Sequence, residues 1–305
     1  MIFDLIIIGG GPAGITAGIY SARKRLKTLL LTKDFIGQAG KTSEVDNFPG
    51  LPGISGPDLM KKFENHLKKF EIEIQEGEEI TKIEKEKEIF LVKTEKRKEF
   101  KGKTVIVATG RDPRPLEVPG EKEFIGRGVS YCSVCDSPFF KGKAVAVIGG
   151  GNAGFEAALD LVPYAKRIFI FERSNSVQAD EILQEWVGKE KKIEIHLNKE
   201  VKIIEGRNKV QALLYQDVKT GKNYQVPIDG VFVQIGSIPA TGFLKNLCEF
   251  NKNDEIKVDF ETCQTSCSGL FAAGDVNNGK WKQIIIAAGE GCRAALAAYE
   301  YLQKR

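Results

Sequence analysis

The sequence lacks the features that mark membrane, secreted and nucleic-acid-binding proteins. Near its start the longest uninterrupted apolar run, Leu5 to Ile8, is far too short to cross a bilayer, and no basic segment of a signal peptide precedes it. The 45 basic and 41 acidic residues are well mixed and leave a net charge of only +4, which argues against a nucleic-acid surface. We therefore expect a cytoplasmic protein with no nucleic acid and no membrane among its partners.

Histidine and cysteine are also scarce, which limits the metal sites that the chain can form. The two histidines, His66 and His196, stand apart from one another and from the cysteines. Cys132 and Cys135 have the spacing of half a zinc site, but structural zinc normally needs four Cys or His ligands. We expect no metal site, and a pair of inert buried thiols remains the other alternative. The remaining cysteines are expected to pack as small hydrophobic residues: Cys248, Cys263, Cys267 and Cys292.

The segment Cys132-Ser133-Val134-Cys135-Asp136 carries the clearest chemical signal. Two cysteines at C-x-x-C spacing can close a small disulfide, and the first thiol of such a pair is often acidified. Asp136 follows directly and can donate or accept a proton for the pair. In a reducing cytoplasm such a pair is more often catalytic than a permanent crosslink, so we predict a redox function.

A glycine-rich turn near the start predicts a dinucleotide site. Ile2 to Ile8 has the composition of a buried parallel strand, and Gly9 to Gly14 follows with G-x-G-x-x-G spacing. A helix with a small apolar face and a second strand, Thr28 to Leu31, come next. This is the strand-turn-helix context that the fingerprint requires. Its glycines let backbone N–H groups approach a pyrophosphate at the start of the helix.

The fingerprint recurs 140 residues later as Gly149 to Gly154, directly after the C-x-x-C segment. A strand from Ala144 to Ile148 precedes it, and a helix (Phe155 to Leu161) and a strand (Arg167 to Phe171) follow. Two such units in one chain predict two bound dinucleotides. A second site that has decayed and is retained only for packing is the alternative.

The rest of the chain predicts how these units are arranged. At 305 residues the chain should form about two domains. Two Pro/Gly-bearing stretches that break regular structure, Arg111 to Pro115 and Ser237 to Gly242, are expected linkers. We predict an α/β fold of two Rossmann-like three-layer dinucleotide-binding domains, the second inserted into the first. The first would comprise residues 1–112 and 243–305, and the second residues 115–240.

Segments outside the glycine motifs fit this division. The expected elements are a helix from Pro57 to Phe70, a small charged hairpin or meander over Glu71 to Phe100 and a meander of the same character over Ile193 to Gln225, strands over Thr104 to Gly110 and Gly230 to Gly236, a strand and turn over Gly269 to Asp275, and a final apolar helix from Gln283 to Leu302. We assign no chemistry to the two meanders.

Together these motifs resemble the low-molecular-weight thioredoxin reductases over nearly the whole chain. The matching segments are Gly9 to Gly14, Ala108-Thr109-Gly110, Cys132 to Asp136, Gly149 to Gly154 and Ala273-Gly274-Asp275. The resemblance implies FAD in the first domain, a nicotinamide cofactor in the inserted domain, a thioredoxin-like protein as partner, and a homodimer.

Val231 to Gly236 and Lys282 to Ala287 also resemble the reductase portion of the alkyl hydroperoxide reductase flavoprotein. That flavoprotein carries an additional N-terminal thioredoxin-like portion. Because Met1 almost adjoins the first strand, we expect this chain to lack such a portion.

The resemblance also implies which residues bind the cofactors. For FAD they are Gly9, Gly11, Pro12, Ala13, Gly14, Thr32, Gln38, Asn47, Thr109, Gly110, Asp275, Gln283 and Ile284. For the nicotinamide cofactor they are Gly149, Gly151, Asn152, Ala153, Gly154, Glu172 and Arg173. Asp275 would accept hydrogen bonds from flavin ribityl hydroxyls, with a helix cap as the alternative. Turn residues are the alternative for Gln38 and Asn47.

Glu172 predicts which nicotinamide cofactor is used. It lies 23 residues after Gly149, as Thr32 lies 23 after Gly9. A carboxylate at this position can bind both adenine-ribose hydroxyls of NADH and repels a 2′-phosphate. By resemblance, NADPH-dependent members carry a His-Arg-Arg and a later arginine here, where this chain has Glu172-Arg173-Ser174 and Gln178. We predict NADH over NADPH; a solvent-facing Glu172 is the alternative.

The resulting hypothesis is an electron relay from NADH through FAD to the Cys132–Cys135 disulfide and then to a partner disulfide. By resemblance, Cys135 faces the flavin, Cys132 attacks the partner, and Asp136 transfers protons. The two linkers offer a hinge, so we expect the inserted domain to rotate between two states. Three alternatives stay open: a peroxiredoxin or glutaredoxin-like carrier, a flavoprotein supplied by ferredoxin, and a non-catalytic redox sensor.

Overall fold

The computed structural model describes residues 1–42 and 45–304. The chain forms two compact units, one of residues 1–112 with 238–305 and the other of residues 113–237. The expected α/β fold of two dinucleotide-binding units, the second inserted into the first in sequence, is confirmed. The second junction lies between Ser237 and Ile238, a few residues before the start at 243 that the sequence suggested.

The first unit is built on a parallel sheet whose central strands are apolar on both faces. Its parallel strands are β3 (Glu73–Glu76), β2 (Thr28–Thr32), β1 (Ile2–Ile8), β6 (Glu99–Val107) and β17 (Leu270–Ala272). The antiparallel hairpin β4 (Ile80–Glu86) and β5 (Ile89–Thr94) extends the same sheet by pairing with the start of β6. Strands buried on both faces have near-continuous apolar sequences, which is why β1 and β2 were recognisable.

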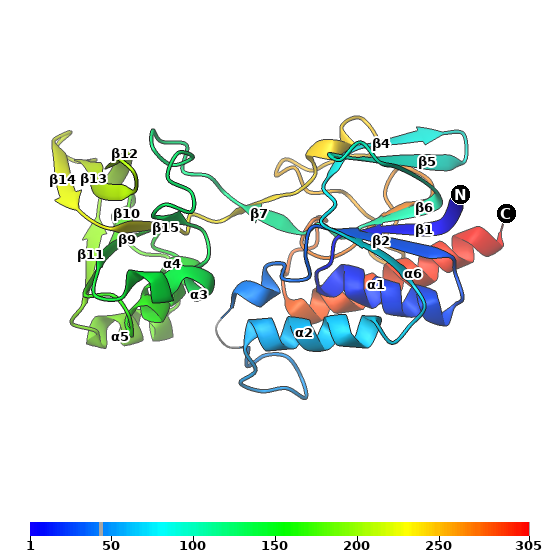
Figure 1. The fold of residues 1–305 in the computed structure, drawn as a ribbon, viewed down its shortest axis with the longest axis horizontal. Helices are drawn as coiled ribbons and strands as arrows, with labels where there is room; N and C mark the ends of the chain where they lie inside the picture. Colours follow the sequence, from blue (N-terminus) through cyan, green and yellow to red (C-terminus); the bar gives the residue numbers. More distant parts are fainter. Residues whose placement is uncertain (43–44, 305) are drawn as a thin grey trace. The chain divides into compact units, whose positions relative to one another are not determined.

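Helices cover one face of this sheet (Figure 1). They are α1 (Pro12–Arg23), α2 (Gly56–Leu67) and α6 (Ile284–Gln303), with the 3₁₀ turns η1 (Ala39–Lys41) and η3 (Gly242–Leu244) in the loops. The core under α1 and α6 contains Leu5, Ile7 and Phe271. Alternate strand residues, such as Ile6 and Ile8, pack on the opposite face with Phe90 and Leu244.

The second unit repeats the three-layer plan with different covering elements. Its parallel strands are β11 (Ile193–Leu197), β10 (Arg167–Glu172), β9 (Ala144–Ile148), β15 (Gly230–Val233) and β8 (Val129–Ser130). One face packs on α4 (Asn152–Leu161) and α5 (Glu181–Lys189), and Phe155 of α4 is fully buried in the core on this face. The other face is covered by an antiparallel sheet of β12 (Lys199–Gly206), β13 (Val210–Asp217) and β14 (Asn223–Pro227).

The expectations for the two linkers and for the two charged segments were wrong in detail. The expected linkers contain β7 (Arg111–Pro113) and β16 (Ser237–Pro239), which pair in a two-stranded sheet. Each expected meander also begins with a strand that joins a parallel sheet, namely β3 and β11. Charged residues on these edge strands are exposed or half-exposed and hid the parallel pairing, because β propensity depends on which face is buried.

Among residues 1–42 and 45–304, no helix is both long enough and apolar enough to cross a bilayer.

Small residues let α6 approach α1 closely, and this generates a matched stability test. A Cβ added at Gly291 would lie 2.0 Å from the carbonyl oxygen of Ala13, whereas one added at Gly289 meets nothing within 4 Å. Gly289→Ala should raise the free energy of unfolding by up to about 1 kcal/mol, because alanine is the better helix former. Gly291→Ala should lower it by about 1–3 kcal/mol because the helices must separate.

Urea denaturation of both variants checks this prediction of helix packing. Equal midpoints for the two alanine variants would contradict the close approach of α6 to α1.

Candidate active site

Cys132 and Cys135 form a disulfide within one helical turn, with Cα atoms 5.4 Å apart. The turn is α3 (Ser133–Asp136), which follows β8 and precedes the 3₁₀ turn η2 (Ser137–Phe140). Cys132 is the N-cap of α3, and its Sγ accepts a hydrogen bond from the Cys135 backbone N–H at 3.2 Å. Cys132 is half-buried and Cys135 is exposed. The two sulfurs are therefore bonded to one another in a turn whose second cysteine is an exposed residue.

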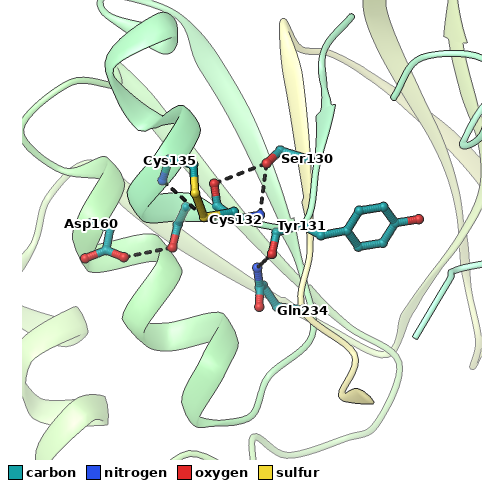
Figure 2. The surroundings of a disulfide bond; sticks show 7 residues. Ser130, Tyr131, Cys132, Cys135, Asp160 and Gln234 are labelled. Carbon is teal, nitrogen blue, oxygen red and sulfur yellow. Dashed lines mark hydrogen bonds between the residues drawn. A yellow bond between two sulfur atoms is a disulfide. The ribbon is translucent and has the colours of Figure 1, made fainter. Parts of the chain in front are cut away.

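Neighbouring side chains fix the backbone on both sides of this disulfide (Figure 2). Ser130 Oγ accepts a hydrogen bond from the Cys132 N–H (3.0 Å) and donates to the Cys132 carbonyl (3.2 Å). Ser133 Oγ donates to Asp160 Oδ2 at 2.7 Å, and Gln234 Nε2 donates to the Tyr131 carbonyl at 3.3 Å. None of these four hydrogen bonds was predicted from the sequence, because the C-x-x-C spacing is the only part of this arrangement that the local sequence shows.

Asp136 ends the same turn. Its backbone N–H donates to the Cys132 carbonyl at 3.2 Å, and the residue is half-buried. The expected proton carrier therefore directly follows Cys135 in the same short helix, which Cys132 caps.

The first glycine motif forms a tight turn with open space ahead of α1. Gly9 has φ +115°, and a Cβ at Gly14 would lie 1.9 Å from the Gly9 carbonyl oxygen. A Cβ at Gly11 would meet nothing within 4 Å. Gly11 is the N-cap of α1 and has no side chain to cap it, so Ala13 and Gly14 at the helix start can offer backbone N–H groups to an anion.

Residues expected to bind FAD come together from distant parts of the first unit. Asn47 Nδ2 donates to Gln283 Oε1 at 3.1 Å, although the two residues are 236 apart in sequence. Gln38 Nε2 donates to the Arg111 carbonyl at 2.9 Å. Gln283 is the N-cap of α6, and Ile284 begins that helix and packs against the core. Because Asn47 and Gln283 are hydrogen-bonded, the structure supports a shared binding site better than the alternative in which Asn47 is only a turn residue.

Two threonines in the expected FAD site are already engaged by the chain. The Thr32 hydroxyl donates to the Asp34 carbonyl at 2.5 Å, and the Thr109 hydroxyl donates to the Ala240 carbonyl at 2.9 Å. Gly110 has φ +66° and open space at its Cβ position. Thr109 therefore fixes the chain at the end of β6, and Gly110 leaves room beside it.

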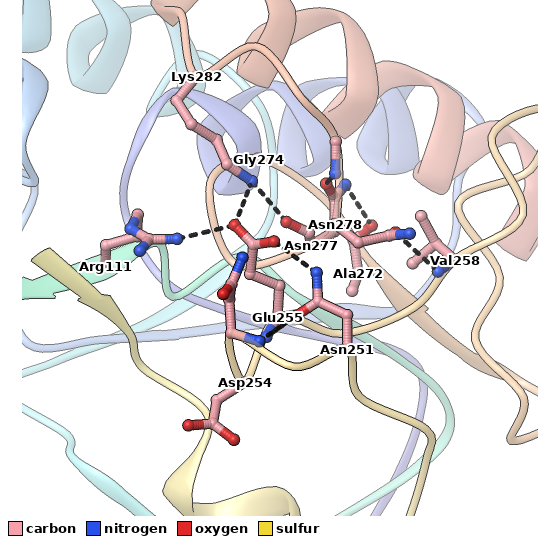
Figure 3. A network of polar contacts seen from close by, with 12 residues as sticks. Arg111, Asn251, Asp254, Glu255, Val258, Ala272, Gly274, Asn277, Asn278 and Lys282 are labelled. Carbon is pink, nitrogen blue, oxygen red and sulfur yellow. Dashed lines mark hydrogen bonds and ion pairs between the residues drawn. The ribbon is translucent and has the colours of Figure 1, made fainter.

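Asp275 belongs to the first unit, where a charged network surrounds Glu255 (Figure 3). Burial raises the pKa of the Asp275 carboxyl, and the nearby positive charges of Lys282 and Arg111 oppose that shift. Glu255 accepts from Arg111 Nη1 at 3.0 Å and pairs with Lys282 Nζ at 3.2 Å. The alternative that Asp275 caps the last helix is wrong, because α6 begins only after Gln283. A half-buried carboxylate near these cations suits an acceptor of hydroxyl hydrogen bonds.

Glu290 is a site residue that the sequence analysis missed. It is buried in α6, and its Oε2 accepts hydrogen bonds from the Gly274 N–H (2.7 Å) and from Asn277 Nδ2 (2.8 Å). These bonds hold the turn that carries Asp275. An acidic residue within an otherwise apolar segment is a signal that could have identified it, since buried acids are normally paired.

The second glycine motif has the same local geometry as the first. Gly149 has φ +121°, a Cβ at Gly154 would lie 2.0 Å from the Gly149 carbonyl oxygen, and Gly151 has open space. Gly151 is the N-cap of α4, so Asn152, Ala153 and Gly154 begin a helix with no side-chain cap. Asn152 Nδ2 donates a hydrogen bond to Asp180 Oδ2, and Asn152 Oδ1 accepts one from the Asp180 backbone N–H, each at 2.8 Å.

Glu172 lies beneath this second turn. Its Oε2 accepts from the Gly150 N–H and its Oε1 from the Ser174 N–H, each at 2.7 Å. The alternative of a purely solvent-facing side chain is therefore wrong. A carboxylate has about four lone-pair sites, so two remain for other donors. Arg173 is largely exposed, with Nε 3.5 Å from Glu200 Oε1.

The residues present fit two dinucleotides. Each unit offers a glycine turn with open space at the N-cap and a helix start without a side-chain cap. Such helix starts bind phosphate through N–H groups and the helix dipole. The first unit adds a half-buried acceptor at Asp275, and the second adds the carboxylate of Glu172.

Comparison with known proteins gives three consistent findings. The family described as "Pyridine nucleotide-disulphide oxidoreductase" matches residues 3–291. The NADH dehydrogenase of Bacillus subtilis (strain 168) is 41% identical over 300 residues, covering 98% of this chain and 58% of that protein. An alkyl hydroperoxide reductase protein of Staphylococcus aureus (strain MRSA252) is 39% identical, covering 98% and 59%. The thioredoxin reductase of Lactococcus lactis, a solved structure, is 37% identical with a TM-score of 0.92, covering 99% and 100%.

The chain thus spans somewhat less than three fifths of the length of these two curated relatives. It matches the solved thioredoxin reductase chain over its full length.

The burial of Asp275 predicts opposite effects on stability and on cofactor binding. A carboxyl whose folded pKa is raised costs stability at pH values above that pKa, and the cost disappears as the pH falls through it. Asp275→Asn should therefore raise the unfolding free energy of the cofactor-free protein at pH 7, with a smaller gain at lower pH. It should also weaken FAD binding, because the charged acceptor is lost.

Urea denaturation and fluorescence titration with FAD measure the two effects. Asp254→Asn, at an exposed aspartate of the same unit, is the control and should change neither quantity. Unaltered FAD affinity in the Asp275 variant would remove Asp275 from the site.

Proposed function

The chain belongs to the pyridine nucleotide-disulphide oxidoreductase family, and we propose that it is an NADH-dependent flavoprotein that reduces a disulfide of a thioredoxin-like protein. The observation that carries the proposal is the Cys132–Cys135 disulfide, held in a single turn of the second dinucleotide unit in which Cys135 is an exposed residue. FAD bound by the first unit would supply two-electron transfer between the nicotinamide and this disulfide. The likeness to thioredoxin reductases supports the partner class.

The geometry of α3 supports different roles for the two cysteines. When the disulfide is reduced, a thiolate at Cys132 would sit at the N-cap and keep the N–H of Cys135 as a donor. Such placement lowers a thiol pKa and favours Cys132 as the nucleophile toward the partner disulfide. Attack forms a mixed disulfide and releases one partner thiolate; Cys135 then displaces the second and re-forms the protein disulfide. Asp136 would supply or accept protons in these steps.

Glu172 supports NADH as the electron donor. Its two bonds to backbone N–H groups fix the carboxylate at the end of β10, below the second glycine turn. There it can accept hydrogen bonds from ribose hydroxyls and would repel a 2′-phosphate. The similarity to a protein named NADH dehydrogenase agrees with this choice.

A second partner class has its own support. The chain is 39% identical to an alkyl hydroperoxide reductase protein over almost its whole length. A peroxiredoxin or a glutaredoxin-like carrier is therefore the second candidate, served by the same disulfide. Parallel assays with thioredoxin, a glutaredoxin and a peroxiredoxin as acceptors distinguish them, because only the true carrier turns over at a low concentration.

Cys135→Ser tests the relay. The variant should bind FAD and accept electrons from NADH, since the dinucleotide residues are intact, and should lose reduction of a protein disulfide by at least about a hundredfold. Cys292→Ser, which removes a half-buried thiol from α6, is the matched control and should turn over normally. Undiminished turnover by Cys135→Ser would refute the relay.

Glu172→Gln tests the choice of cofactor. The amide keeps an acceptor for one backbone N–H but removes the charge that repels a 2′-phosphate. The ratio of kcat/KM for NADH over NADPH should fall by about tenfold or more. Steady-state kinetics with both cofactors measure the ratio, and an unchanged ratio would show that Glu172 does not select the cofactor.

A further inference from the structure

One hydrogen bond ties the redox turn to the helix of the second glycine motif. Ser133, between the two cysteines, donates from Oγ to Asp160 Oδ2 at 2.7 Å. Ser133 is buried on α3, and Asp160 is half-buried in the last turn of α4. Ser133 thus anchors the C-x-x-C segment from within, whereas Ser130 holds the chain just before the segment.

We propose that Asp160 is a positioning residue that, through Ser133, holds α3 in the geometry that closes the disulfide and so sets the redox equilibrium of the pair. The inference deepens the proposed function and rests on it for the biological use of the pair. The equilibrium itself belongs to the two cysteines and can be measured without any cofactor or partner.

The length of α3 explains why an external anchor matters. A helix of four residues cannot persist by itself, because nucleation is unfavourable and few internal hydrogen bonds form. Once the sulfur–sulfur bond opens, the turn depends on the contacts of Ser130 and Ser133 to keep its shape. An anchored turn loses less conformational freedom when the disulfide closes again, so the anchor favours the oxidised form.

The chemistry of the acceptor strengthens the anchor. A hydrogen bond to an ionised carboxylate is stronger than one between neutral groups. Burial raises the pKa of Glu156, one turn earlier on α4, and the negative charges of Asp160 and Asp180 add to the shift. Loss of Asp160 would also leave the buried Ser133 hydroxyl without this acceptor, which costs more than losing an exposed bond.

Equilibration with dithiothreitol tests the proposal. In this exchange two electrons and two protons pass from the dithiol to the Cys132–Cys135 bond, and dithiothreitol closes its own ring. After acid quenching and alkylation, peptide mass spectrometry reads the reduced fraction at these two cysteines separately from the other four.

Asp160→Ala and Ser133→Ala should each shift this equilibrium toward the dithiol by about tenfold, which is about 30 mV in potential. Because both changes remove the same hydrogen bond, the double variant should show no more than the larger single effect. Effects that add in the double variant would contradict action through this bond. Parent-like equilibria in both single variants, whatever their thermal stability, would overturn the proposal.

Two further variants separate positioning from charge and from general perturbation. Asp160→Asn keeps an oxygen acceptor of the same shape without the charge and should shift the equilibrium clearly less than Asp160→Ala; behaviour like Asp160→Ala would mean that charge acts instead of the bond and would overturn the proposal. Glu185→Ala removes an exposed acid from α5 of the same unit and should leave the equilibrium unchanged. If the protein proved to serve no carrier, these equilibria would still decide the role of Asp160.

Discussion

The closure of one sulfur–sulfur bond within a single helical turn is the constraint on which the functional account depends. Cys132 and Cys135 occupy the ends of a turn too short to be stable alone. Hydrogen bonds from Ser130 and Ser133 supply the order that the turn lacks. The surrounding bonds therefore hold the two cysteines in the geometry in which the disulfide is closed.

The two dinucleotide units share the same glycine turn and helix start, and they differ in the residue at the end of the following strand. Both place a glycine with positive φ at the end of a strand and an uncapped helix start after it. At the end of the next strand, the first unit has Thr32, which is bonded to its own loop, and the second has Glu172, which faces the glycine turn. The shared glycine turn and helix start suit the binding of a pyrophosphate. The residue that differs, Thr32 or Glu172, suits discrimination between ribose groups.

Local patterns predicted the elements that local physics determines. The glycine turns, the apolar parallel strands and the C-x-x-C turn were all visible, because each depends on residues adjacent in sequence. Contacts between distant segments were not visible, such as Asn47 with Gln283, or Asp160 with Ser133. The short strands β7 and β16 in the expected linkers were not predicted. Each is paired with the other, and the two segments lie far apart in sequence, so neither is recognisable as a strand from its own residues.

The central claim is that electrons from NADH reach the Cys132–Cys135 bond through FAD held by the same chain. Anaerobic titration of the FAD-loaded protein with NADH tests it most directly, with the visible flavin bands and the free thiols at these two cysteines followed together. The account predicts uptake of about two equivalents, one for the flavin and one for the disulfide, with both thiols appearing. Bleaching of the flavin after one equivalent, with the disulfide still intact, would contradict it.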